Sequence, residues 1–171
     1  GCLLPPSSQT FTGNGFDVHA FEDGKPMVLG GETIDSAFGF KAHSDGDVAL
    51  HALIDALLGA ACLGDIGILF PDNDQQYKNI DSKILLEKCV TILHQFGFVI
   101  SHVDVTIMAQ APRLAEYKSK MKKTIARILM IPPTRVNIKA TTTENLGFIG
   151  RKEGVGVLAT ASVNYFDWTK A

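Results

Sequence analysis

Apolar residues recur along most of the chain at spacings typical of regular secondary structure. Between residues 47 and 58 they lie three and four positions apart, which predicts an amphipathic helix. The same spacing predicts helices over about residues 82–96 and 114–129. Alternating or short apolar runs predict strands over about 16–20, 27–29, 99–107, 136–140 and 155–166.

The order of these elements predicts the fold class. Strands and helices are intermixed without a strict β-α-β-α alternation. This order favours an α/β fold of the α+β type, a two-layer sandwich in which helices cover one face of a mixed sheet. Residues 1–11 contain a Pro-Pro-Ser-Ser run and are interpreted as a linker or an artificial addition, and 12–171 as one domain.

Composition narrows the class of protein. A chain of 171 residues with 46% hydrophobic content is long enough for one well-buried domain. A formal net charge of -2 gives no basic field, so neither nucleic acid nor an anionic membrane is an expected partner. The chain has neither an apolar run long enough to span a membrane nor a signal-peptide pattern, and its three widely spaced cysteines argue against a disulfide framework, so we expect a cytoplasmic protein.

Three residues form a candidate metal site. Asp17 and His19 are two apart in a predicted strand, so their side chains point to the same face. His51 lies on the polar stripe of the first predicted helix, with Asp47 and Asp55. Two histidines and one carboxylate leave a fourth tetrahedral position open, which is the pattern of a catalytic zinc site.

Residues 43–47, His-Ser-Asp-Gly-Asp, immediately precede this helix. The simplest interpretation is that Ser44 or Asp45 caps the helix. Alternatively, the free amides of the helix N-terminus bind an anion, and His43 donates a hydrogen bond to a phosphate oxygen.

Two further polar segments have open interpretations. Residues 65–74 are either an ordinary loop or a lid over a hydroxylated substrate. Three consecutive threonines at 141–143 suit an exposed edge strand, but together with Glu144 they could also bind phosphate and a magnesium-like cation. Cys89, His94 and His102 have no such neighbours and are interpreted as ordinary core or surface residues.

Taken in order, several segments resemble the 2-C-methyl-D-erythritol 2,4-cyclodiphosphate synthases of the non-mevalonate isoprenoid pathway. The resemblance runs from about residue 14 to 166 and rests on these motifs: GFDVH at 15–19, HSDGDVALH at 43–51, DALLGA at 55–60, GDIG at 64–67, FPD at 70–72, AQAP at 109–112, and KATTTE at 139–144 followed by LGF at 146–148. The linker-like start also resembles the junction in bifunctional versions, in which a cytidylyltransferase domain precedes the cyclase.

The resemblance implies a reaction and a set of roles. The 2-phosphate of 4-diphosphocytidyl-2-C-methyl-D-erythritol 2-phosphate attacks the β-phosphorus and expels CMP. Asp17, His19 and His51 would hold Zn2+, and Glu144 would hold Mg2+ or Mn2+. His43 and Thr142 would stabilise the transition state.

The resemblance also assigns substrate-binding residues and a homotrimer. Ser44 would position the 2-phosphate, and Arg151 would lie near the trimer axis, where an isoprenoid diphosphate could bind. Arg113 stands where the family has Lys, which changes the geometry of that contact. The remaining residues assigned to substrate are Asp65, Ile66, Gly67, Phe70, Pro71, Asp72, Asn73 and Asp74 toward the methylerythritol, Ala109, Gln110, Ala111, Pro112, Arg113, Leu114, Ala115, Thr141 and Thr142 toward the cytidine, and also Thr143 and Phe148.

Two alternatives from other classes stay open at the level of sequence. Two histidines and a carboxylate also form the facial triad of non-haem iron oxygenases. A non-catalytic trimer that binds isoprenoid or nucleotide diphosphates is the second alternative. The identity of the bound metal and turnover of the cytidyl substrate distinguish these alternatives from a cyclase.

Overall fold

A five-stranded mixed sheet forms one layer of the protein. The computed structural model describes residues 9–167 and residue 169. The strands lie in the order β4-β1-β7-β5-β6, and only β5 and β6 run parallel. Their bounds are Phe38–Phe40 for β4, Thr10–Asp23 for β1, Gly154–Tyr165 for β7, Phe98–Met108 for β5 and Val136–Thr141 for β6.

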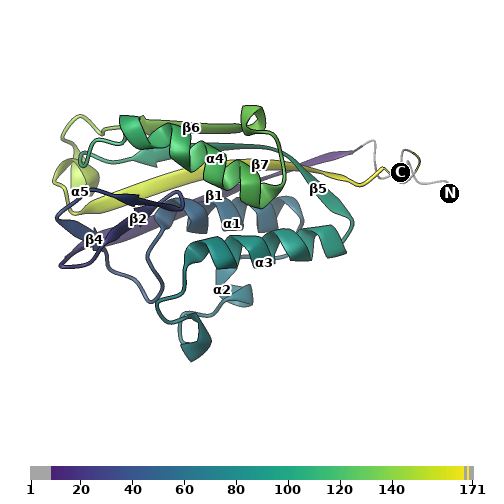
Figure 1. The fold of residues 1–171 in the computed structure, drawn as a ribbon, viewed down its shortest axis with the longest axis horizontal. Helices are drawn as coiled ribbons and strands as arrows, with labels where there is room; N and C mark the ends of the chain where they lie inside the picture. Colours follow the sequence, from purple (N-terminus) through teal and green to yellow (C-terminus); the bar gives the residue numbers. More distant parts are fainter. Residues whose placement is uncertain (1–8, 168, 170–171) are drawn as a thin grey trace.

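Three helices form the second layer and lie against one face of this sheet (Figure 1). Helix α1 packs on β1 and β7, α3 contacts β5, and α4 contacts β6. The bounds are Val48–Ala60 for α1, Ser82–Gln95 for α3 and Lys118–Leu129 for α4. Shorter elements are the helices α2 (Ile66–Leu69) and α5 (Gly147–Gly150), the 3-10 turns η2 (Gln75–Tyr77), η3 (Ala115–Tyr117) and η4 (Pro133–Arg135), and a separate hairpin of β2 (Met27–Leu29) and β3 (Glu32–Ile34).

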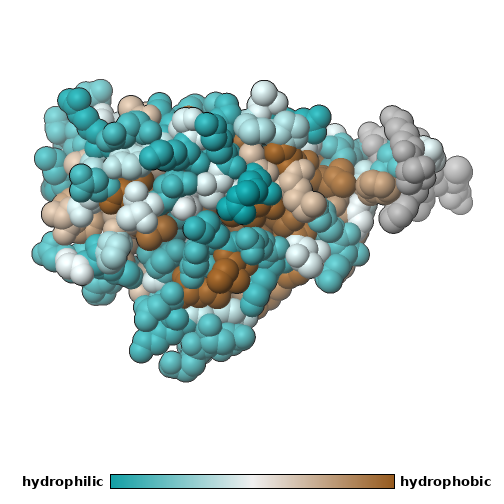
Figure 2. Space-filling model, viewed as in Figure 1, coloured by the Kyte–Doolittle hydropathy of each residue, from teal (hydrophilic) through white to brown (hydrophobic). Residues whose placement is uncertain are grey.

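The core lies between the two layers. Every second residue of β7 from Val155 to Val163 is buried under the helices, and Leu50, Leu53 and Leu57 of α1 are fully buried against it. The face seen in Figure 2 is covered by hydrophilic residues interrupted by several apolar patches. Within the described chain, none of the helices has the length and apolar character needed to cross a membrane.

The predicted elements are confirmed with shifts at their ends. The third helix starts at Lys118 rather than 114, because the preceding residues form a 3-10 turn. Strand β1 already begins at Thr10, so the last two residues of the predicted linker are strand and pair with Asn164 and Val163 of β7. Residues 1–8 of the predicted linker lie outside the described residues. Strands β3 and β4 were not predicted.

Strand β1 exposes apolar residues on one face and directs polar residues toward a helix on the other. Its apolar residues Phe16 and Val18 are 60% and 36% exposed on the open face of the sheet, while Asp17 and His19 point toward α1. A Cβ added at Gly15 would lie 1.9 Å from the carbonyl oxygen of Ala52, so β1 and α1 are in backbone contact. The polar face of β1 is therefore held directly beside the helix that carries His51.

Candidate metal centre

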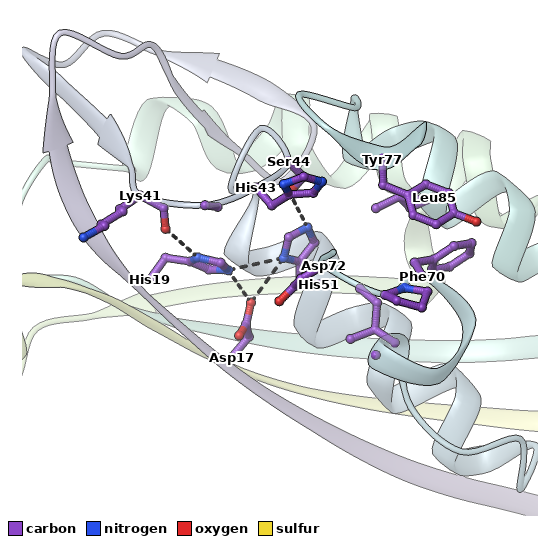
Figure 3. Close-up of a pocket in the computed structure, with 14 residues that line it drawn as sticks. Asp17, His19, Lys41, His43, Ser44, His51, Phe70, Asp72, Tyr77 and Leu85 are labelled. Carbon is purple, nitrogen blue, oxygen red and sulfur yellow. Dashed lines mark hydrogen bonds and ion pairs between the residues drawn. The ribbon is translucent and has the colours of Figure 1, made fainter. Parts of the chain in front are cut away.

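Asp17, His19 and His51 converge although 32 residues separate the two histidines (Figure 3). Asp17 Oδ2 lies 2.7 Å from His19 Nε2 and 3.3 Å from His51 Nδ1, and the two nitrogens are 3.3 Å apart. A tetrahedral zinc ion with bonds of about 2.0–2.1 Å places its ligand atoms about 3.3 Å from one another. Two of the three separations have this value, so the donor set fits a tetrahedral ion with one open position.

The other nitrogen of each imidazole is held by an oxygen. His19 Nδ1 donates to the carbonyl oxygen of Lys41 at 3.3 Å, which leaves the Nε2 lone pair directed at Asp17 and His51. His51 Nε2 lies 2.9 Å from Ser82 Oγ and 3.2 Å from Ser44 Oγ. Hydrogen bonds of this kind orient the rings of metal-binding histidines.

Charge in the cluster favours an ionised aspartate. Burial opposes the charge on Asp17, but its interactions with the rings of His19 and His51 outweigh that effect and lower the pKa of Asp17 to about 2. Burial likewise opposes protonation of His19, yet the bond to Asp17 raises the pKa of His19 above its usual value. The carboxylate therefore favours the protonated form of His19, and a bound cation would compete with that proton.

A cavity of about 300 Å³ opens in front of the cluster. Of the residues predicted to bind substrate, it is lined by His43, Ser44, Ile66, Gly67, Phe70, Pro71 and Asp72. The predicted residues Asp65, Asn73 and Asp74 do not line it, and Asp65 and Asp74 instead cap the short helices α2 and η2. The prediction missed Lys41, Ala42, Tyr77 and Leu85 as lining residues. Of these four, only Lys41 and Ala42 could have been found from the sequence, because they directly precede the motif that begins at His43.

The residue that caps α1 is not the one predicted from the sequence. The N-cap is Asp47, not Ser44 or Asp45, and its carboxylate accepts hydrogen bonds from the amides of Leu50, Gly30 and Gly31. Burial and the charge of Asp45 raise the pKa of Asp47 to about 6. Asp47 thus links the start of α1 to the β2–β3 turn, because the two oxygens of its carboxylate accept hydrogen bonds from both segments.

The segment after α1 closes over the cavity and contacts the predicted catalytic histidine. His43 Nε2 lies 3.1 Å from the carbonyl oxygen of Asp74, and the amide of Asn79 donates to the carbonyl oxygen of His43. Asp55 accepts a 2.7 Å hydrogen bond from the amide of Ile66, one turn along α1 from His51. The segment predicted as either loop or lid is therefore anchored both on α1 and on the connection between β4 and α1 that contains His43.

A second cavity of about 220 Å³ lies where β5 and β6 end together. The parallel register pairs Met108 with Thr141, so the residues that follow both strands meet at one edge of the sheet. Most of the predicted cytidine-binding residues line this cavity, namely Ala109, Gln110, Pro112, Arg113, Leu114, Ala115, Thr141 and Thr142, together with Ala140. It has no lining residue in common with the first cavity.

The remaining predicted residues, Ala111, Thr143, Glu144, Phe148 and Arg151, line neither cavity. Glu144 lies in a turn at φ 54°, and the following amide donates to Gln110 Oε1. Its side chain is exposed. Arg151 Nε donates to Glu153 Oε2 at 2.6 Å on the surface.

Comparison with known proteins gives consistent matches along the whole domain. Residues 10–164 match the model of the YgbB family. A protein of Sulfurimonas denitrificans named as the bifunctional enzyme IspD/IspF is 66% identical over 169 residues, which are 99% of this chain and 44% of that protein.

Two solved structures have the same fold. The bifunctional IspDF of Campylobacter jejuni matches with a TM-score of 0.91 and 51% identity over 94% of this chain and 44% of its own. A 2C-methyl-D-erythritol-2,4-cyclodiphosphate synthase described as the CDP-bound form matches with a TM-score of 0.82 and 33% identity over 89% of this chain and 99% of its own. The chain thus spans about half the length of its bifunctional relatives and almost all of a single-domain one.

Proposed function

Because the chain belongs to the YgbB family, we propose that it cyclises 4-diphosphocytidyl-2-C-methyl-D-erythritol 2-phosphate to 2-C-methyl-D-erythritol 2,4-cyclodiphosphate and releases CMP. The observation that carries this proposal is the convergence of Asp17, His19 and His51 at the base of a cavity. The cavity volume of about 300 Å³ suits a small phosphorylated polyol.

Zinc is the proposed ion for this centre. The donor set is two imidazole nitrogens and one carboxylate oxygen, two of the three separations match a tetrahedral ion, and one position stays free for a substrate oxygen. When bound, the ion supplies Lewis-acid polarisation of a phosphate.

The chain itself supplies alignment and charge stabilisation. His43 and Ser44 lie at the mouth of the metal centre, where an imidazole N–H and a hydroxyl can donate to phosphate oxygens. In the proposed reaction His43 and Thr142 stabilise the charge that develops as the 2-phosphate attacks and CMP departs, and Ser44 holds the 2-phosphate. The attacking group belongs to the substrate, so the protein needs no nucleophile of its own.

The cavity at the ends of β5 and β6 is the proposed cytidine pocket. Residues 109, 110 and 112–115 border it, and the backbone groups of such a segment can form hydrogen bonds to the edge of a base. Glu144, in the turn beyond Thr142, is the proposed ligand of a Mg2+ or Mn2+ ion that neutralises the diphosphate.

A homotrimer with shared active sites is the proposed assembly. Within one chain the two cavities are separate, whereas the substrate joins a methylerythritol and a cytidine through a single diphosphate. The open sheet face exposes Phe16, Val18 and Leu158, the last of them 46% exposed, which favours burial against neighbouring subunits. We further propose that Arg151 lies near the trimer axis. The proposal also includes a cytidylyltransferase domain fused to this one and a cytoplasmic location.

A CMP-release assay tests this function. Purified protein is given the cytidyl substrate before and after treatment with a chelator, and then with added Zn2+. We expect CMP and the cyclic diphosphate to form together, activity to fall with the chelator, and zinc to restore it. Absence of CMP release by the fully metal-loaded protein contradicts the proposal, and iron as the tightly bound metal would favour an oxygenase.

A further inference from the structure

We infer that Ser82, backed by the carboxylate of Asp45, is the positioning residue that fixes the His51 ring for metal binding. Ser82 lies 31 residues from His51 in sequence, at the first position of α3, and its side chain is completely buried. The inference rests on the proposed zinc centre but concerns residues with no assigned role in it.

The direction of each hydrogen bond in this chain of contacts follows from the partners. The Asp45 carboxylate accepts from the hydroxyl of Ser82 at 2.5 Å and from the amide of Ser82 at 2.9 Å. A carboxylate can only accept, so the Ser82 hydroxyl hydrogen points at Asp45 and the lone pairs of Oγ are left for His51. His51 Nε2, at 2.9 Å from that oxygen, must therefore carry the hydrogen.

This assignment has a direct consequence for the metal centre. With the hydrogen on Nε2, the Nδ1 lone pair of the neutral imidazole faces Asp17 and His19. The negative charge of Asp45 acts through the hydroxyl to increase the electron density of the ring, which strengthens Nδ1 as a ligand. The link joins the N-terminus of α3, the segment before α1 and the metal centre.

Ser44 is the competing partner for the same nitrogen. Its Oγ is farther from His51 Nε2, at 3.2 Å, and it accepts the amide hydrogen of Gly46. Ser44 borders the cavity, whereas Ser82 does not. The geometry therefore divides the two hydroxyls, with Ser82 committed to His51 and Ser44 available to a ligand in the cavity.

Zinc affinity measured by competition with a chromogenic chelator separates these roles. Ser82→Ala should weaken zinc binding about 10- to 100-fold, the usual effect of removing such a supporting group. Ser44→Ala should change it less than threefold, and Ser82→Cys, of similar size but with a poor acceptor, should resemble Ser82→Ala. Thr124→Ala is the matched control, because Thr124 Oγ1 also donates to a carboxylate at 2.5 Å, that of Glu32, away from the metal ligands.

A spectroscopic measurement distinguishes positioning from general loosening of the fold. The visible absorption bands of Co2+ bound in place of zinc should shift in Ser82→Ala and stay unchanged in Thr124→Ala, while thermal unfolding of both metal-free variants reports fold stability. Zinc affinity and Co2+ bands of Ser82→Ala equal to those of the parent would overturn the inference, as would an equal loss in Ser44→Ala. Turnover by the parent is measured alongside, so failure of the cyclase proposal shows there independently of the Ser82 result.

Discussion

At the scale of single residues, the metal centre depends on which atom of each side chain faces the ion. His19 presents Nε2 because the Lys41 carbonyl oxygen holds Nδ1, and His51 presents Nδ1 because Nε2 is held by hydroxyls. Asp17 binds both rings through one oxygen. Each of the three residues is therefore constrained by a partner, and none is interchangeable with a residue of similar polarity.

The substitution Asp17→Asn tests this centre. A neutral amide is a poorer ligand than a carboxylate and removes the charge that attracts the cation, so we expect at least a 100-fold loss of zinc affinity and loss of most activity. Metal analysis after gel filtration measures occupancy. Asp23→Asn, at the exposed end of the same strand, is the control and should keep full zinc. Full occupancy in both variants would refute the assignment.

A substitution at Glu144 distinguishes the role of the proposed Mg2+ or Mn2+ ion from that of zinc. Glu144→Gln should retain zinc but lose activation by Mg2+ or Mn2+, because hard cations bind a neutral amide weakly. The activity is titrated with each divalent ion at saturating substrate, beside Glu116→Gln as an exposed control. An unchanged divalent-ion dependence of Glu144→Gln would argue that this cation binds elsewhere.

At the scale of elements, close packing of β1 on α1 brings the ligands together. Glycine at positions 13 and 15 lets the two backbones touch, since an added Cβ would lie 2.3 Å and 1.9 Å from carbonyl oxygens of α1. Asp47 fixes the start of the same helix by accepting three amide hydrogens. The position of His51 relative to Asp17 and His19 is thus determined by an interface and a cap, outside the ligands themselves.

A pair of glycine substitutions measures the contribution of this interface. Gly15→Ala must push α1 away from β1, so we expect a loss of about 3 kcal/mol in unfolding free energy and weaker zinc binding. In the control Gly59→Ala, on α1, the added Cβ meets nothing closer than 3.7 Å, so the change should be neutral or stabilise the fold by about 0.5–1 kcal/mol. Denaturant unfolding and zinc competition provide the two measurements. Equal behaviour of both variants would show that the contact does not set the geometry.

At the scale of the whole molecule, the proposed assembly is supported by exposed apolar side chains on the outer face of the sheet and by two cavities that share no lining residue. Phe16 and Leu158 are exposed on the sheet face opposite α1, α3 and α4, and an apolar surface of this kind is stabilised by burial against another subunit. Sharing a site between subunits would bring a metal-side cavity next to a nucleotide-side cavity. Within the described chain the two cavities share no lining residue.

Complementation between two inactive variants tests the shared site. His51→Ala and Glu144→Ala are unfolded together in equal amounts and reassembled. In a cyclic trimer with heterologous interfaces, about a quarter of the interfaces then combine an intact metal half with an intact nucleotide half. We expect activity near a quarter of the parent value. If confirmed mixed trimers are no more active than the separate variants, each site lies within one chain.

The sequence by itself determined the three long helices, most of the strands, the mixed α/β class and the candidate ligands. Helical spacing around Leu50 and alternation around Val157 are local properties, and Asp17 and His19 are neighbours in a strand whatever the fold. Motif order added the resemblance, which the family match confirms.

Only the tertiary structure decided which face of β1 is covered, which residue caps α1 and what supports His51. Alternation shows that Phe16 and Asp17 point opposite ways, but not which direction meets the helices. Asp47 caps α1, and its carboxylate also accepts from two amides of the β2–β3 turn that lie far away in sequence. Ser82 reaches His51 only because α3 packs beside α1, and contacts between residues so far apart in sequence depend on how the layers pack rather than on any local pattern.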